Sequence, residues 1–154
     1  MEIIWERGPI IAHTELLAHS LRHWTGRELV PGAGDARELA RRLFELPGVV
    51  VSHGTEADPV LNYGNRAALA LWEMEWDEFT RTPSRFTAEA PNREERARLL
   101  AEVTAGGFID NYSGVRIAKG GRRFRIDQAT VWNLIDAGGG RCGQAARFER
   151  WEFL

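Results

Sequence analysis

Apolar residues recur at three- and four-residue steps in two stretches near the start of the chain, and this spacing is typical of amphipathic helices. The first stretch spans residues 13–24, with Thr14 as its expected N-cap and Gly26 as its expected stop. The second helix is expected to begin after Asp35 and to end at Pro47-Gly48. The pattern therefore predicts a helical segment over residues 1–47, ahead of the main fold.

Beyond residue 47 the pattern favours strands at both ends and helices between them. Residues 49–51 and 60–63 flank a turn at Asp58-Pro59 and predict a hairpin. Asn65 then opens a short helix, residues 76–80 predict a further helical turn, and Asn92 is the expected N-cap of a longer helix that ends at Gly106-Gly107. Three strands follow at residues 108–118, 122–135 and 142–153, joined by glycine-containing loops that suit hairpins.

This order of elements is too antiparallel at its end for a doubly wound sheet. It predicts an α+β fold with a five-stranded antiparallel sheet and helices on one face, preceded by two N-terminal helices. The sequence shows no internal repeat, low-complexity segment or linker. We therefore expect one domain over residues 1–154, with a helical segment at 1–47 and the core at 48–154.

The charge and composition of the chain argue against several classes of function. The 154 residues include 20 basic and 22 acidic ones, and the net charge of −2 gives no general attraction to a phosphate backbone or an anionic membrane. The one cysteine, Cys142, cannot form an internal disulfide, which favours a reducing compartment. The opening residues lack the features of a secretion signal, and no run of about 18 apolar residues occurs. We expect a cytoplasmic protein that binds neither nucleic acid nor a membrane.

Several short motifs along the chain resemble one known family. They include His23-Trp24-Thr25-Gly26, Val50-Val51-Ser52-His53-Gly54-Thr55, Asn62-Tyr63-Gly64-Asn65, Tyr112-Ser113-Gly114-Val115-Arg116, and Val131-Trp132-Asn133-Leu134 with Gly143-Gln144-Ala145-Ala146. The family is MEKHLA, found at the carboxy terminus of plant class III homeodomain-leucine zipper factors and as free-standing small proteins in bacteria and algae. The resemblance implies a PAS-like fold, with helices and sheet around a pocket, and a role in sensing or protein contact. We expect a free-standing version of the bacterial type.

The strand predicted at residues 122–135 supplies one wall of the pocket that the resemblance implies. Strict alternation places Phe124, Ile126, Gln128, Thr130, Trp132 and Leu134 on one face. Gln128 and Thr130 are polar groups on an apolar face, so they either bind each other and the backbone or bind a small ligand. The predicted pocket residues are His53, Asn65, Trp72, Phe124, Ile126, Gln128, Thr130, Trp132 and Gln144.

Flavin and haem are both disfavoured as cofactors, and the identity of any ligand stays open. PAS domains that bind flavin for light sensing carry an asparagine-cysteine-arginine motif on the central helix, and this chain lacks that cysteine. The strand positions that should hold amides hold Arg116 and Ile126 instead, which leaves only Gln144. Haem iron in PAS domains is usually coordinated by a histidine on the helix before the last three strands. This chain has no histidine in that helix.

No metal site is expected either. His19 and His23 lie one helical turn apart, but no acidic residue or cysteine completes the set nearby. We therefore expect these two histidines, with His13 on the same helix, to cap or to pack.

Ser52, His53 and Asp58 lie close enough along the chain to suggest a hydrolase. Residues so near one another on a strand and turn do not converge easily as nucleophile, base and orienting acid. We interpret them as turn-forming groups and expect no catalysis, so an enzyme that uses His53 is the least favoured hypothesis.

Two non-catalytic hypotheses remain. The first is a sensory or regulatory module that binds a small ligand, a protein partner or both, and the alternative is a ligand-free interaction domain. Six tryptophans are too many to bury fully in a core of this size, so some are expected at a homodimer interface. Arg116, Arg122, Arg123 and Arg125 concentrate positive charge on one hairpin, which either keeps a sheet edge soluble or receives an acidic partner.

Overall fold

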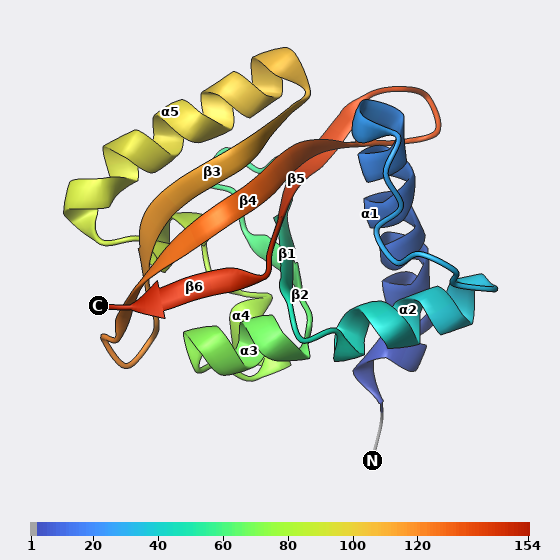
Figure 1. Cartoon of the computed structure of the whole chain (residues 1–154), viewed down its shortest axis with the longest axis horizontal. Coiled ribbons are helices and arrows are strands. Elements are labelled where there is room, and N and C mark those ends of the chain that lie inside the picture. The colour runs from blue at the N-terminus through green and yellow to red at the C-terminus, as the bar shows by residue number, and fades with distance from the viewer. Residues whose placement is uncertain (1–2) are drawn as a thin grey trace.

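The structure is a computed structural model that describes residues 3–154, without the side chains of residues 90 and 91. Its N-terminal part holds η1 (Ile4–Glu6), α1 (Gly8–Thr25) and α2 (Ala36–Glu45). The core follows as β1 (Val49–His53), β2 (Leu61–Gly64), α3 (Arg66–Trp72), α4 (Trp76–Phe79), η2 (Ser84–Thr87), α5 (Ala90–Gly106), β3 (Phe108–Ile117), β4 (Arg123–Ile135), β5 (Arg141–Phe148) and β6 (Arg150–Phe153) (Figure 1). This succession confirms the predicted α+β fold and its two leading helices.

The strands form one antiparallel sheet in the order β2-β1-β5-β4-β3, and β6 also pairs with β4. The strand predicted at residues 142–153 is therefore divided in two. β5 pairs with Thr130–Ile135 of β4, whereas β6 pairs with Phe124–Asp127. Both segments lie on the edge of β4 that is opposite to β3. The polypeptide thus follows one edge of β4 with a break at Glu149.

Capping groups set several helix ends as the sequence predicts. The Asp35 carboxylate accepts from the Glu38 N–H at 2.8 Å, the Asn65 amide oxygen accepts from the Ala68 N–H at 3.2 Å, and Gly26 ends α1 with φ 73°. Two predicted N-caps are wrong. Thr14 lies inside α1, where its hydroxyl donates to the Ile10 carbonyl, and Asn92 lies in the first turn of α5.

Helices cover both faces of the sheet. On one face, Leu99 and Val103 of α5 pack on Val131 of β4, while the side chains of α3 pack on the start of the same strand. On the opposite face, α1 packs through Leu17 and Leu21 on Trp132 and other residues of β4. Figure 1 shows α5 beside β3 on one side of the molecule and α1 with α2 on the other. The cavity described below lies on the α5 face.

The predicted alternation along β4 is wrong from Gln128 onward. Gln128 has φ 54°, so the strand is locally irregular there and gains one position. Because side chains alternate with a period of two, that extra residue moves every later side chain to the other face. Phe124 and Ile126 share a face with Ala129 and Val131, whereas Thr130, Trp132 and Leu134 lie on the α1 side.

Candidate functional site

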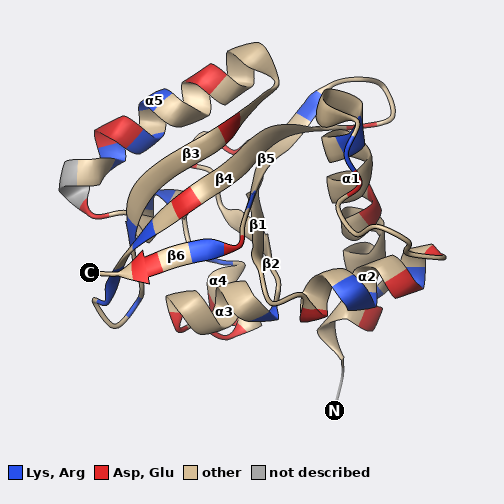
Figure 2. Cartoon of the chain, in the orientation of Figure 1, with Lys and Arg blue, Asp and Glu red and all other residues tan. Residues whose placement is uncertain are grey.

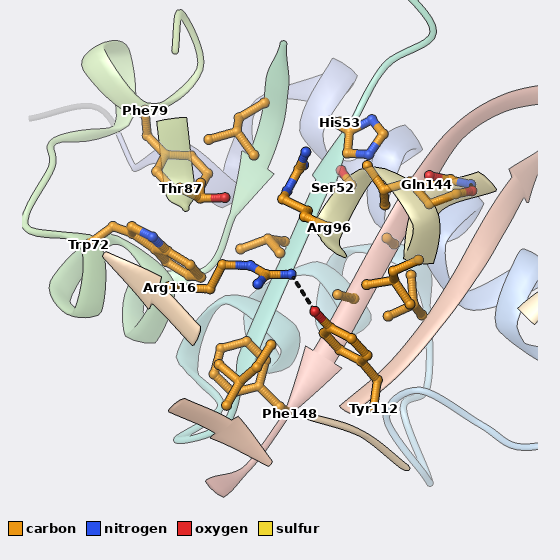
Figure 3. Close-up of a pocket in the computed structure, with 18 residues that line it drawn as sticks. Ser52, His53, Trp72, Phe79, Thr87, Arg96, Tyr112, Arg116, Gln144 and Phe148 are labelled. Atoms are coloured by element: carbon orange, nitrogen blue, oxygen red, sulfur yellow. Dashed lines mark hydrogen bonds between the residues drawn. The ribbon is translucent and has the colours of Figure 1, made fainter. Parts of the chain in front are cut away.

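A cavity of about 70 Å³ lies between the sheet and the helices on the α5 face. Its walls come from all of β1 to β5 in the sheet, from α3, α4 and α5, and from η2. Apolar side chains such as Leu61, Phe79 and Phe148 make up most of the lining. The polar lining residues are Ser52, His53, Thr87, Arg96, Tyr112, Arg116 and Gln144 (Figure 3).

Four of the nine predicted pocket residues line this cavity: His53, Trp72, Ile126 and Gln144. The Gln144 amide nitrogen lies within hydrogen-bond distance of Leu100 O, Thr104 Oγ1 and Asn133 Oδ1, at 3.1, 2.9 and 3.0 Å. Gln144 thereby ties β5 to α5 and to β4. Binding of a ligand by these four residues stays a prediction.

The other predicted residues lie away from the cavity lining, four of them on β4. Phe124 is fully buried and packs edge-on against Trp72, with ring centroids 5.2 Å apart. Gln128 is exposed at the irregular position of β4, and Thr130 and Trp132 face away from the cavity for the reason given above. The hydroxyl of Thr130 donates to Asp110 Oδ1 at 2.7 Å.

Asn65 has a structural role instead of a place on the cavity wall. Its amide oxygen accepts from the N–H groups of Val50 and Ala68, and its amide nitrogen donates to the carbonyls of Leu43 and Gly48. A fully buried side chain with four such bonds joins α2, β1 and α3. It leaves no amide group for a ligand.

Two arginines point into the cavity (Figure 3). Arg116 on β3 is only 6% exposed, and it donates to the Val115 carbonyl at 2.8 Å and to the Tyr112 hydroxyl at 3.0 Å. The Tyr112 hydroxyl in turn donates to the Glu95 carboxylate. Arg96 on α5 makes no hydrogen bond or ion pair with any residue that the structure describes. Burial lowers the pKa of Arg96 to about 10, and the positive charge of Arg116 acts in the same direction.

The inward positions of Arg116 and Arg96 were not predicted from the sequence, and the expectation that Arg96 is solvated at the start of its helix is wrong. Arg116 was grouped with Arg122, Arg123 and Arg125, and those three side chains are exposed. Alternation along β3 carries the missing signal, because it places Arg116 on the same face as Ala118, which is buried. An arginine beside a buried alanine is thus expected to point inward as well.

His53 is the buried imidazole of the site. Its Nδ1 lies 2.9 Å from the Gly54 carbonyl, so Nδ1 carries the hydrogen and donates it. Nε2 is buried without a hydrogen-bond partner among the described residues, and so is the indole nitrogen of Trp72. Burial lowers the pKa of His53, partly offset by the Gly54 hydrogen bond, and the charges of Arg96 and Arg141 lower it further. His53 is therefore neutral at pH 7.

Ser52 and His53 belong to β1 and are not turn residues, while Asp58 pairs with Arg85 and His53 bonds to the Gly54 carbonyl. Ser52 does contact a histidine, but it is His13 of α1, whose Nε2 lies 2.8 Å from the Ser52 hydroxyl. The single hydroxyl hydrogen of Ser52 goes to Asn62 Oδ1, so the His13 Nε2–H must donate to Ser52. His13 therefore does not act as a base toward Ser52 in this arrangement.

The family of this chain follows from a match to a known family profile. The family profile described as the MEKHLA domain matches residues 11–153. The chain belongs to the MEKHLA domain family. No curated protein gives a significant sequence match to this MEKHLA domain.

Solved structures show that this MEKHLA domain has a PAS fold. It is similar to the PAS domain of a protein from Colwellia psychrerythraea, with a TM-score of 0.63 and 10% identity over 75% of this chain and 92% of that one. An RNA-binding light-oxygen-voltage receptor gives a TM-score of 0.64 and 18% identity over 77% of this chain and 34% of the receptor. A light-oxygen-voltage domain studied with a flavin analogue gives 0.59 and 15% over 75% of this chain and 84% of that one.

The cavity of this MEKHLA domain does not fit a flavin or a haem. Pockets for ligands of drug size enclose roughly 300–1,000 Å³, whereas this one encloses about 70 Å³. Cys142 on β5 is not part of the lining, so no thiol faces the cavity. His53 offers an unpartnered imidazole nitrogen, but the space for a porphyrin beside it is lacking.

Within residues 3–154, no group of three or more histidine, cysteine or acidic side chains is arranged to hold a metal ion. None of the helices described in this MEKHLA domain combines the length and the apolar character that crossing a membrane requires.

Proposed function

We propose that this MEKHLA domain is a non-catalytic sensory or regulatory module of the cytoplasm that binds a small ligand in the cavity and signals through a protein partner. One observation carries the proposal: polar groups of the cavity lining have no hydrogen-bond partner among the described residues, namely the buried Nε2 of His53, the buried Nε1 of Trp72 and the half-buried guanidinium of Arg96. Burying polar groups without partners destabilises a fold, and such groups are typically bound to something. A ligand would supply the missing partners.

A chain of hydrogen bonds connects the cavity with α1 on the other face of the sheet. The Asn133 amide donates to the Val103 carbonyl of α5 at 2.9 Å, and its backbone carbonyl accepts from the Trp24 indole of α1 at 2.9 Å. Ser52 of the cavity wall bonds to His13, also on α1. These contacts support a route by which a movement of α5 on ligand binding changes the position of α1.

A protein is a more suitable partner than a nucleic acid. Acidic and basic residues are interspersed on α2 and α5 (Figure 2), and the net charge is −2. RNA binding by the similar receptor is therefore not extended to this chain, which spans 34% of that protein. A homodimer is the second candidate readout, and it is favoured by the exposed apolar side chains of Phe153 and Leu154 at the end of the sheet.

The first test is a native mass spectrum with an absorption spectrum of the protein purified from the cells that produce it. A reproducible added mass is the expected result, and the same spectrum reports the dimer. The variant Ala146→Leu adds bulk to the cavity wall beneath α5 and should lose the added mass. Ala137→Leu, in an exposed turn, is the matched control and should keep it.

Two results would count against a ligand-binding module. One is a native protein that carries only its chain mass and is not stabilised by any member of a metabolite library. The other is a ligand that remains bound to Ala146→Leu as tightly as to Ala137→Leu. The first result would move the proposal to the interaction domain that works without a ligand, and the second would show that the ligand binds outside this cavity.

A further inference from the structure

The charges around the cavity do not balance. Two guanidinium groups, Arg96 and Arg116, belong to its lining, and no described lining residue is acidic. Glu95 is the carboxylate tied into this network, but it is bonded to the Tyr112 hydroxyl and makes no ion pair with either arginine. The cavity therefore has a net positive character on the wall formed by α5 and β3.

Most of the donors of these guanidinium groups are uncommitted. A guanidinium carries five N–H donors, of which Arg116 uses one at Nη1 and one at Nη2. Arg96 uses none with the described residues. A buried charge without an opposite charge costs several kcal/mol in an empty site, and a carboxylate bound by arginine forms short, charge-assisted hydrogen bonds that offset this cost. An anion is thus the occupant that these donors lack.

The volume and the walls restrict what kind of anion fits. One water-sized site corresponds to roughly 10–15 Å³ of cavity volume, so a cavity of about 70 Å³ accepts about five to seven non-hydrogen atoms. Apart from the arginines the lining is mostly apolar and includes Leu61, Leu99 and Val131. A nucleotide or a sugar phosphate is too large, and an inorganic ion would leave the apolar part empty. A short acid with a hydrocarbon end matches both halves.

We infer that the ligand of this cavity is a small organic acid, a carboxylate of about three to five carbons, whose anionic group binds Arg96 and Arg116. The inference rests on the proposed ligand-binding function and specifies its chemistry. Arg116 is held by Tyr112 and by Val115 before the ligand arrives, whereas Arg96 gains its partner only in the complex. Acid binding therefore draws α5 toward the sheet, which is the movement that the contacts to α1 would transmit.

The test is a binding titration of the full chain by calorimetry, followed by thermal unfolding at constant ionic strength. The probes are sodium propionate, butyrate and lactate, with propionamide and butyramide as neutral partners of nearly the same shape. The acids are expected to bind and to raise the melting temperature, and the amides are expected to bind at least tenfold more weakly. Inorganic phosphate is titrated in parallel.

The decisive variant is Arg96→Met, which keeps the length of the side chain and removes its charge. It should unfold at a higher temperature than the wild type when no acid is present, because it removes a half-buried charge that has no opposite charge among the lining residues described. It should also lose at least tenfold in affinity for the acids. Arg98→Met is the matched control, since Arg98 lies on the exposed side of α5. Its acid affinity should stay within twofold of the wild type.

The inference is overturned if the amides bind as tightly as the acids, or if Arg96→Met binds the acids as tightly as Arg98→Met does. It is also overturned if phosphate binds and the organic acids do not, or if none of these probes binds. These results leave the proposed function intact when the native protein carries another added mass that Ala146→Leu abolishes. The proposed function itself fails only by the separate results given above.

Discussion

Asn65 offers the sharpest test of how the site is supported, because the structure gives it a role that a simple helix cap does not have. Its amide oxygen accepts from Val50 N–H at 3.1 Å and from Ala68 N–H at 3.2 Å. Its amide nitrogen donates to Leu43 O at 3.1 Å and to Gly48 O at 2.8 Å. An aspartate at this position keeps the two acceptors and loses the two donors.

Asn65→Asp is therefore expected to destabilise the protein although aspartate is as good an N-cap as asparagine. It places a buried carboxylate oxygen against two carbonyl oxygens, and an unpaired buried polar group costs about 1–3 kcal/mol, more for a charged one. We expect a loss of about 3 kcal/mol at pH 7, and about 3–5 kcal/mol for Asn65→Ala, which loses all four bonds at roughly 0.5–1.5 kcal/mol each. For a chain of this size the melting temperature should fall by about 10 °C.

The measurement is chemical unfolding at pH 7, followed by intrinsic tryptophan fluorescence. Asp35→Asn is the matched control, because Asp35 caps α2 through one exposed bond to Glu38 and makes no second set of contacts. That change should alter the free energy of unfolding by less than about 0.5 kcal/mol. If Asn65→Asp were as stable as Asp35→Asn, the two donor bonds would contribute nothing and Asn65 would be an ordinary cap.

Three further changes test two backbone positions and the half-buried imidazole of His13. Gly107→Ala should lower the free energy of unfolding by about 2–4 kcal/mol in a urea titration, because Gly107 has φ 97° and an added Cβ would overlap the Trp24 ring. An added Cβ at Gly106 meets nothing within 4 Å, so Gly106→Ala should be neutral. Burial lowers the pKa of His13 from 6.5 to about 4, so only the unfolded chain binds this proton between those pH values. Stability should fall by about 3 kcal/mol as the pH drops across that range, and His13→Gln should flatten the curve. Gln128→Val should lower the melting temperature and Gln128→Gly should not, because φ is 54° at that residue.

The fold was predictable from the sequence where a local signal and the tertiary structure agree. Asp35 and Asn65 are good caps in any context, and Gly26 and Gly107 end helices with positive φ angles that favour glycine. Thr14 and Asn92 have the same chemistry as working caps but lie inside helices, because α1 and α5 begin earlier in the chain. A cap residue predicts a helix end only when the residues before it cannot extend the helix.

The prediction for the second half of β4 was wrong for a different reason. Gln128 has no sequence feature that marks a left-handed backbone, so strict alternation was the natural expectation along the whole of β4. Trp132 was expected to line the pocket but contacts α1 instead. Val131, the residue before it, lines the cavity. A single irregular residue therefore decides which side chains of this strand can meet a ligand.

The arginines show how far strand alternation predicts which side chains face the cavity. Alternation along β3 places Arg116 on the inner face of the sheet. Arginine is mostly exposed in proteins, however, and this general tendency led to the wrong expectation that Arg116 lies on the surface. A buried arginine is rare because the charge needs a partner, so its appearance in a cavity without acidic residues is informative in a way that a buried leucine is not. The free-energy cost of placing a positive charge in a cavity makes the inward positions of Arg96 and Arg116 hard to predict. The same cost makes an acid the expected ligand, since it is removed only when an anion binds.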